Sequence, residues 1–384
     1  MENEISRMLR AAACHASPVF LSARGTTDKC LSLIQQTARS KANLIAFPES
    51  FIPAFPLWSS LRPPTANHDF FHAMAKESIY ADGEEIQAIR ASAKQHQITV
   101  SLGISEKVRY SNATLFNSNL IINENGEIVA HHRKLMPTFF EKLTWSPGDG
   151  HGLHVAETQR GRVGNLICGE NTNPLARYAL MAQREQLHIS TWPAVWPTRA
   201  PNFGSSKDEK QRHAETTSKG RNYDNVTANR TRAAAHCFEA KCFGMLCSGH
   251  LSRDAIEAIA DGSADPAGIK AFLESSPKGV SMFLDPTGAV VPGFTVTNDG
   301  QQQQLDYLQN EEGVLYADLN LEDCIEGKQY HDVVGGYQRF DVFQLSVNRE
   351  RKEPIVFEEV KGIGKVSKEA EEEGHGTTIS TKAR

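Results

Sequence analysis

The stretch Asn43-Leu44-Ile45-Ala46-Phe47-Pro48-Glu49 decides the fold of this chain, because it is a continuous apolar run stopped by a proline. A run of this length is typical of a strand buried on both faces. Residues 26–42, just before it, repeat apolar side chains at helical spacing, and residues 17–22 form another apolar run. We therefore expect a βαβ unit that places Glu49 at the carboxyl end of a parallel strand, the edge of a sheet where ligands bind.

The same alternation continues along the chain. We predict a helical stretch over residues 69–95, strands at 98–104, 114–122 and 127–132, and a further strand–helix–strand unit over 162–190. These elements indicate one large α/β domain over residues 1–348. Residues 201–220, rich in serine, lysine and glutamate, are expected to form a surface loop or a subunit contact. Charge dominates residues 349–384, which we expect to be a disordered tail.

Composition excludes several classes of partner. The 384 residues are 40% hydrophobic and 23% charged, with a net charge of −5, so nucleic acids and anionic membranes are not attracted over long range. No apolar stretch reaches about 18 residues, the length of a membrane span, and the first residues do not resemble a secretory signal. The seven cysteines show no disulfide framework. We expect a protein of the reducing cytoplasm.

Three segments carry residues suited to covalent catalysis. Cys168 ends the apolar run that starts at Gly164, which presents a thiol at a strand end. A free thiol has a pKa of about 8.5, so it needs a base or a cation nearby to act as a nucleophile. Glu49 supplies a base, and Lys134 supplies a cation that stabilises developing negative charge. Glu141, seven residues after Lys134, adds a second carboxylate.

Together these segments resemble the nitrilases, a branch of the carbon-nitrogen hydrolases with a Glu-Lys-Cys triad. The similar segments, in the order found in the family, are 47–53 around the base, 134–150 around the lysine and 166–170 around the nucleophile. Residues 188–197 and 335–343 also resemble the nitrilase branch. The resemblance covers about residues 17–348 and implies a four-layer α-β-β-α sandwich. It also implies a homo-oligomer that is built from dimers, in some cases into a spiral.

The resemblance further implies the chemistry. Cys168 would attack a small-molecule nitrile, with Glu49 as base, and pass through a thioimidate and a thioester to a carboxylic acid and ammonia. Lys134 and the Gly169 N–H would stabilise charge on nitrogen, and Glu141 would orient Lys134. No metal or cofactor is needed. We expect Gly169, Trp192 and Phe139 to line the substrate pocket. Nitrilases usually have tryptophan at the position of Gly169, so this chain is expected to have more room or more backbone freedom beside its thiol.

The same residues allow other interpretations. An amidase or carbamoylase would use the same triad, because both reactions share the thioester, and a non-catalytic assembly protein could keep the same fold. Glu170 either contacts the substrate or supports its loop. The cysteines at 237, 242 and 247 lack the short paired spacing of zinc ligands, so we assign them to core packing.

Overall fold

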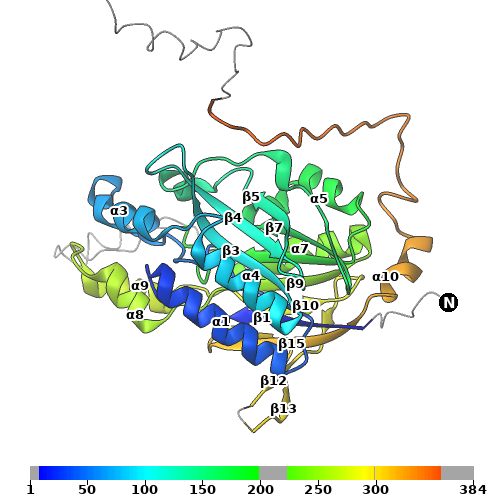
Figure 1. Cartoon of the computed structure of the whole chain (residues 1–384), viewed down its shortest axis with the longest axis horizontal. Helices are drawn as coiled ribbons and strands as arrows, with labels where there is room; N and C mark the ends of the chain where they lie inside the picture. Colours follow the sequence, from blue (N-terminus) through cyan, green and yellow to red (C-terminus); the bar gives the residue numbers. More distant parts are fainter. Residues whose placement is uncertain (1–7, 199–222, 298, 356–384) are drawn as a thin grey trace, which may run out of the picture. The chain divides into compact units, whose positions relative to one another are not determined.

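The computed structural model describes residues 8–198, 223–297 and 299–355, and the described residues up to Arg351 form one compact unit of sheets and helices (Figure 1). The predicted loop at 201–220 and residues 356–384 of the predicted tail lie outside the described residues. Residues 352–355, which begin a second unit, contain neither helix nor strand. Among the described helices, none has the length and apolar content needed to cross a membrane.

Two β-sheets form the centre of the first unit. The eight-stranded sheet has the order β13-β12-β15-β1-β2-β3-β4-β5, and the seven-stranded sheet has the order β11-β10-β9-β8-β7-β6, with β14 paired to β10. The strands of the first sheet are β1 Met8–His15, β2 Leu44–Ala46, β3 Thr99–Lys107, β4 Leu115–Ile122, β5 Ile128–Arg133, β12 Phe294–Val296, β13 Gln302–Gln304 and β15 Gly313–Asn320. Those of the second sheet are β6 Ala156–Thr158, β7 Gly161–Ile167, β8 Leu187–Trp192, β9 Phe243–Ser248, β10 Ser281–Leu284, β11 Val290–Val291 and β14 Tyr307–Leu308.

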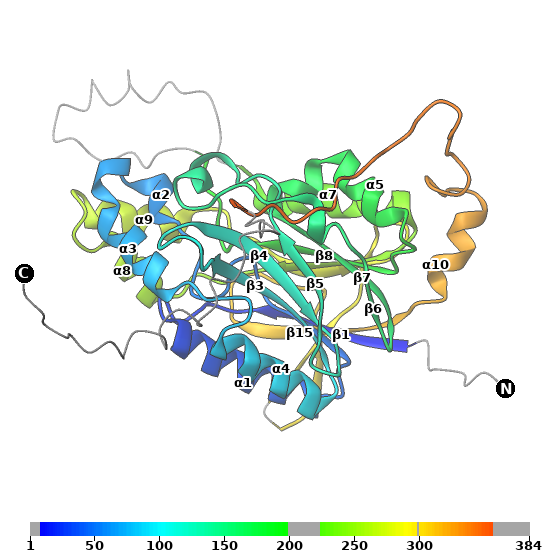
Figure 2. The ribbon, with the colours of Figure 1, turned by 45° about the horizontal axis from the view of Figure 1, so that its top comes forward.

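The sheets pack face to face between two layers of helices (Figure 2). Helices α1 (Ala23–Arg39) and α4 (Glu84–His96) cover the outer face of the eight-stranded sheet, and α5 (Pro174–Met181) and α7 (Asn225–Ala240) cover that of the other. Successive side chains of a strand point to opposite faces. In β1, for example, Ala11 belongs to the core between the sheets and Ala12 to the core under α1 and α4. The predicted four-layer α-β-β-α sandwich is confirmed.

The prediction of the first strand was wrong. Strand β1 is Met8–His15, and residues 17–22 form a turn into α1. The backbone N–H and C=O of Val19 both bond to the hydroxyl of Thr26, so this residue does not pair with a strand. The side chain of Ser22 then caps α1 by accepting the N–H of Gly25. Local side-chain hydrogen bonds thus take the place of a ladder in an apolar segment.

The helical stretch predicted over residues 69–95 is two helices, α3 (His68–Glu77) and α4. Between them, Ser78 donates hydrogen bonds to Met74 of α3 and to Ser105 of β3. Helices α8 (Arg253–Ala260) and α9 (Pro266–Ser275) were not predicted, and they pack beside the short α2 (Trp58–Leu61) in a separate apolar cluster. Within the described residues, the α-helix nearest the carboxyl end is α10 (Asp323–Glu326).

Strand direction brings the predicted site together. Strands β1, β2 and β3 are mutually parallel, as are β7, β8 and β9. Glu49 follows β2, Lys134 follows β5 and Cys168 follows β7, so each candidate side chain comes directly after the carboxyl end of a strand. Gly103 of β3 makes room for the first of these turns, because a Cβ there would lie 2.1 Å from the carbonyl oxygen of Pro48.

Candidate active site

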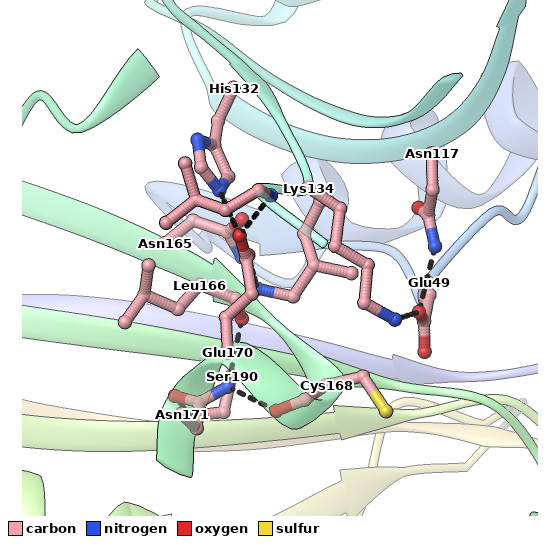
Figure 3. Close-up of polar contacts among 12 residues, drawn as sticks. Glu49, Asn117, His132, Lys134, Asn165, Leu166, Cys168, Glu170, Asn171 and Ser190 are labelled. Atoms are coloured by element: carbon pink, nitrogen blue, oxygen red, sulfur yellow. Dashed lines mark hydrogen bonds and ion pairs between the residues drawn. The ribbon is translucent and has the colours of Figure 1, made fainter. Parts of the chain in front are cut away.

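The carboxylate of Glu49 is buried and held from two sides. Its Oε1 accepts hydrogen bonds from Asn117 Nδ2 and from Lys134 Nζ, both at 2.8 Å, whereas its Oε2 has no partner among the described residues (Figure 3). Burial raises the pKa of Glu49 to about 7, against the opposing effect of Lys134, and the charge of Glu141 raises it further. A carboxylate with a free oxygen and a raised pKa is suited to take up a proton near neutral pH.

The ammonium of Lys134 lies between two carboxylates. Its Nζ is 2.8 Å from Glu49 Oε1 and 2.6 Å from Glu141 Oε2, and all three side chains are fully buried. Burial alone lowers the pKa of this lysine, but the charges of Glu141, Glu49 and Cys168 raise it well above its usual value. Lys134 therefore stays protonated. The Glu141 carboxylate is fixed in turn by the backbone N–H of Thr138 at 3.0 Å.

Cys168 completes the cluster. Its Sγ and one carboxylate oxygen each of Glu49 and Glu141 lie within 4.8 Å of one another. Burial, and then the charge of Glu49, raise the pKa of the Cys168 thiol well above its usual value, although Lys134 lowers it. The resting group is therefore a thiol that needs a base to remove its proton. The three predicted residues and Glu141 are brought together in the structure.

These residues do not offer a site for a metal ion, although a thiol and two carboxylates converge. The position that a cation would take between the carboxylates belongs to the Lys134 ammonium, which contacts one oxygen of each. A second buried group, Glu185, His236 and Cys242, also has metal-ligand side chains. There both carboxylate oxygens already bond to histidines, at 2.8 Å to His188 and 2.6 Å to His236. Cys237, Cys242 and Cys247 are fully buried, as predicted for core residues.

The nucleophile turn is held by a buried polar network. Cys168 has a φ of +51°, in the left-handed region, and begins a 3-10 turn, Cys168–Thr172. Asn171 Nδ2 donates to the carbonyl oxygens of Leu166 at 3.1 Å and Cys168 at 3.0 Å. Its Oδ1 bonds to His188 Nε2 at 2.8 Å and to the Ser190 hydroxyl at 3.0 Å. The network continues through His188 to Glu185, so side chains of β8 and of the segment between α5 and β8 support the backbone beside the thiol.

Glu170 supports the same turn. Its carboxylate accepts the backbone N–H groups of Leu135 and Ile167 and bonds to His132 Nε2 at 2.9 Å (Figure 3). These bonds tie the lysine segment to the nucleophile segment. Although burial opposes it, His132 holds the pKa of Glu170 below its usual value. Of the two roles considered for Glu170, structural support is the one that these contacts match.

A cavity of about 370 Å³ opens beside the thiol. Of the predicted pocket residues, Gly169 and Trp192 line it together with Cys168. Phe139 does not line it, and its side chain is 70% exposed. The other lining residues are Thr138, Pro193, Trp196, Tyr223, Asn225, Asn229 and Arg232. A second cavity, of about 430 Å³, lies against Glu49 and Pro193 and is lined mainly by apolar side chains such as Phe51, Phe55 and Leu251.

Gly169 is matched to Thr138. A Cβ at position 169 would lie 2.7 Å from the Thr138 hydroxyl oxygen, closer than real Cβ contacts allow. Thr138 also fixes Glu141, because its backbone N–H donates to the Glu141 carboxylate. The Thr138 side chain therefore occupies the space that a side chain at position 169 would need. Sequence reasoning identified the glycine but not this contact.

Some residues of the site carried no signal in the sequence. Asn117 lies inside β4, and Asn171, His188 and Arg232 belong to no motif that chemistry alone would single out. Asn171 follows the nucleophile by three residues, and that spacing is the one local clue to its role, since asparagine side chains commonly bond to nearby backbone.

Comparison with known proteins identifies the family of this chain. The carbon-nitrogen hydrolase family model matches residues 10–329, most of the chain. A nitrilase from Penicillium rubens is 30% identical over 360 residues, covering 94% of this chain and 99% of that protein. A bromoxynil-specific nitrilase from Klebsiella pneumoniae subsp. ozaenae is 33% identical over 356 residues, 92% of this chain and 89% of that protein. The chain belongs to the carbon-nitrogen hydrolase family.

Within that family, its relatives over the whole domain place it among the nitrilases, as the sequence motifs predicted. A solved carbon-nitrogen hydrolase from Helicobacter pylori G27 shares the fold, with a TM-score of 0.59 at 17% identity, over 85% of this chain and 94% of that one. The protein is therefore a hydrolase that acts on carbon–nitrogen bonds. The family match, the fold and the sequence motifs agree on this class.

Proposed function

We propose that this protein hydrolyses an organic nitrile to a carboxylic acid and ammonia, with Cys168 as nucleophile, Glu49 as base and Lys134 as electrostatic stabiliser. The observation that carries the proposal is the buried cluster in which the Cys168 thiol lies within 4.8 Å of two carboxylates and the Lys134 ammonium bridges those carboxylates. It occurs in a chain whose relatives include nitrilases of several organisms.

The first half of the reaction forms a thioimidate. Glu49 takes the thiol proton while the sulfur bonds to the nitrile carbon, and that proton passes to the nitrile nitrogen. Lys134 and the Gly169 N–H stabilise the negative charge that develops on this nitrogen. A base with a pKa near 7 suits this step, because the thiol that it must deprotonate has a raised pKa.

The second half uses two water molecules. One adds to the thioimidate carbon with Glu49 as base. The carbon–nitrogen bond then breaks, ammonia departs, and a thioester remains on Cys168. A second water then releases the acid and restores the thiol. Glu141 contacts Lys134 at 2.6 Å, and we assign it the role of holding the ammonium in place. Gly169 and Trp192 are proposed to line the substrate pocket. Phe139 remains a predicted pocket residue, and reaching the substrate would require its exposed side chain to turn toward the cavity.

We further propose a homo-oligomer built from dimers, which can extend into a spiral. The support is a group of exposed apolar side chains near the end of the first unit, namely Tyr330, Tyr337, Phe340, Val342 and Phe343. Exposed apolar side chains that gather in a patch mark association sites. Light scattering of the purified protein should give a mass above that of the monomer, and Phe340→Ser/Phe343→Ser should lower it, whereas Tyr110→Ser at another exposed site should not.

The compartment proposed is the cytoplasm. All seven cysteines are free, as expected for a chain kept in a reducing environment.

The test is turnover of aliphatic, aryl and arylaceto nitriles and of the matching amides, with ammonia, acid and amide measured separately. We expect acid and ammonia from at least one class of nitrile, and no turnover by Cys168→Ala with its secondary structure and mass unchanged. Hydrolysis of amides without any nitrile would instead favour an amidase or carbamoylase. An assembled protein that is inert on the whole panel would favour the non-catalytic alternative.

A further inference from the structure

Arg232 brings a positive charge to the wall of the cavity that holds the thiol. It lies on α7, and its guanidinium stacks over the ring of Trp192, with 4.7 Å between the guanidinium carbon and the ring centroid. Both residues line the cavity together with Cys168. The charge of Arg232 is close enough to lower the pKa of the Cys168 thiol, although burial has the larger and opposite effect.

The charge of Arg232 has no anionic partner among the described residues. Its Nε donates to the Ala228 carbonyl oxygen at 3.0 Å, and its Nη2 donates to Asn229 Oδ1 at 3.1 Å and to the Tyr223 hydroxyl. Its Nη1 makes only a long contact, 3.4 Å, with the hydroxyl of Thr172. All four partners are neutral, and the Nη1 end keeps donor capacity, because a guanidinium has five N–H groups.

A nearby arginine shows what a compensated charge looks like in this layer of the fold. Arg177 of α5 forms an ion pair with Glu239 of α7, with Nη1 at 2.6 Å from the carboxylate. Arg232 lies two turns before Glu239 on α7, yet no carboxylate of the described residues pairs with it. An unpaired cation that is partly shielded from water is unfavourable unless something of opposite charge binds there.

A second donor in the same cavity lacks an acceptor. Trp192 is 1% exposed, and its indole N–H has no hydrogen-bond partner among the described residues. Buried indole N–H groups normally find an acceptor. The cavity therefore presents a guanidinium, which calls for a ligand with acceptor atoms and negative charge, and its wall includes a tryptophan whose N–H has no acceptor among the described residues.

We infer that the substrate of this enzyme is a nitrile that carries a carboxylate, with its nitrile carbon at Cys168 and its carboxylate at Arg232. The inference rests on the proposed function and names its substrate class. Arginine binds carboxylates through paired, charge-assisted hydrogen bonds, so its planar group suits this role better than lysine would.

The alternative is that Arg232 only supports the structure, by stacking on Trp192 and bonding to Asn229. Loss of such support would weaken the handling of every substrate by a similar factor. Loss of carboxylate recognition would instead weaken the binding of charged substrates alone. The ratio of the binding constants of a charged nitrile and of a neutral one of the same shape therefore separates the two roles.

The experiment uses ω-cyano carboxylates with two to four methylene groups and, for each, the methyl ketone of the same length, which replaces the carboxylate by a neutral group of similar shape. Binding is measured by titration calorimetry on the full chain carrying Cys168→Ala, which cannot turn the ligand over. The same measurement is made after adding Arg232→Gln or, as a matched control, Arg230→Gln, which changes an exposed arginine of the same helix.

For at least one chain length, we expect the carboxylate to bind roughly 10- to 100-fold more tightly than its ketone, as for a lost charge-assisted hydrogen bond. Arg232→Gln should abolish this preference and Arg230→Gln should keep it. Equal binding of carboxylates and ketones, or a preference that survives Arg232→Gln, would overturn the inference. Ammonia release by the protein with its thiol intact separates the two proposals. Release from the ketones without a carboxylate preference would leave the proposed function standing and refute this inference. Arg232-dependent binding without ammonia release from any nitrile would support this inference about the ligand and refute the proposed function.

Discussion

The contact between Gly169 and Thr138 can be tested by adding a single methyl group. In Gly169→Ala the new Cβ would lie 2.7 Å from the Thr138 hydroxyl oxygen, whereas ordinary contacts begin at 3.4 Å. Thr138 is tied to Glu141 through its backbone, because its N–H donates to Glu141 Oε2 and its carbonyl oxygen accepts the N–H of Glu141. Overpacking of this kind costs about 1–3 kcal/mol.

The consequence should reach the chemistry. Thr138 donates its backbone N–H to the same Glu141 oxygen that contacts Lys134, so displacing the threonine moves the ammonium. We expect Gly169→Ala to lower the free energy of unfolding by about 2 kcal/mol and the rate of ammonia release by about tenfold, the equivalent of 1.4 kcal/mol. Urea denaturation and an ammonia assay measure the two effects.

A double variant makes the reasoning refutable. Thr138→Ala removes the hydroxyl and leaves the threonine Cβ position 3.8 Å from the added methyl. The double variant Gly169→Ala/Thr138→Ala should therefore be as stable as Thr138→Ala alone, a coupling of about 1–2 kcal/mol. Gly336→Ala is the control, because its added Cβ would meet no atom closer than 3.4 Å. Additive losses in the double variant, or a Gly169→Ala protein that behaves like Gly336→Ala, would refute the steric argument.

Three further predictions concern the supporting network and the titratable groups. Asn171→Ala removes four buried hydrogen bonds and should cost about 4 kcal/mol in urea denaturation. Asn173→Ala, which removes only the exposed cap of α5, should cost about 1 kcal/mol, and equal losses would contradict the role given to Asn171. Because Glu49 must be deprotonated to act as base and its pKa is raised to about 7, kcat/KM for a neutral nitrile should fall about tenfold per pH unit below that value. A profile that stays flat well into the acid range would show that another group is the base. Burial lowers the pKa of His15 to about 4, so the unfolded chain binds more protons than the folded one above that pH, up to the usual histidine pKa. The free energy of unfolding should therefore fall as the pH falls through that window, by about 1 kcal/mol per unit, and His15→Gln should reduce the slope by that amount.

The motifs predicted the core of the site because each follows a strand end. Glu49, Lys134 and Cys168 lie far apart in sequence, but strand direction brings the three ends together, and the apolar runs before Glu49 and Cys168 indicate two of these strands. Trp192 was predicted to line the pocket because it is one of the aromatic residues that flank the motifs. The prediction that Phe139 lines the pocket did not locate its side chain. A residue in a 3-10 turn at a φ of +51° can point toward the cavity or toward solvent, and sequence does not fix that direction.

The errors have physical causes of their own. Strand β1 is rich in alanine, and alanine carries little strand propensity, yet small side chains fit a strand that lies between β2 and β15 and is buried on both faces. The apolar residues at 17–22 looked more like a strand but form a turn fixed by Thr26. Arg232 and Asn171 act through contacts made across the fold, and no periodicity or spacing reports such contacts.

The free, buried cysteines make the layers of this molecule separately observable. Cys30 lies in the core under α1, Cys247 in the core between the sheets, and Cys237 in the core under α7, each fully buried. Cys247 also points its thiol at the carbonyl oxygen of Ala46 in the opposite sheet, 3.2 Å away. A thiol reagent can reach each of these only when its own layer opens. The rates at which they are modified in the native protein would thus time the opening of each layer, without any probe being added to the chain.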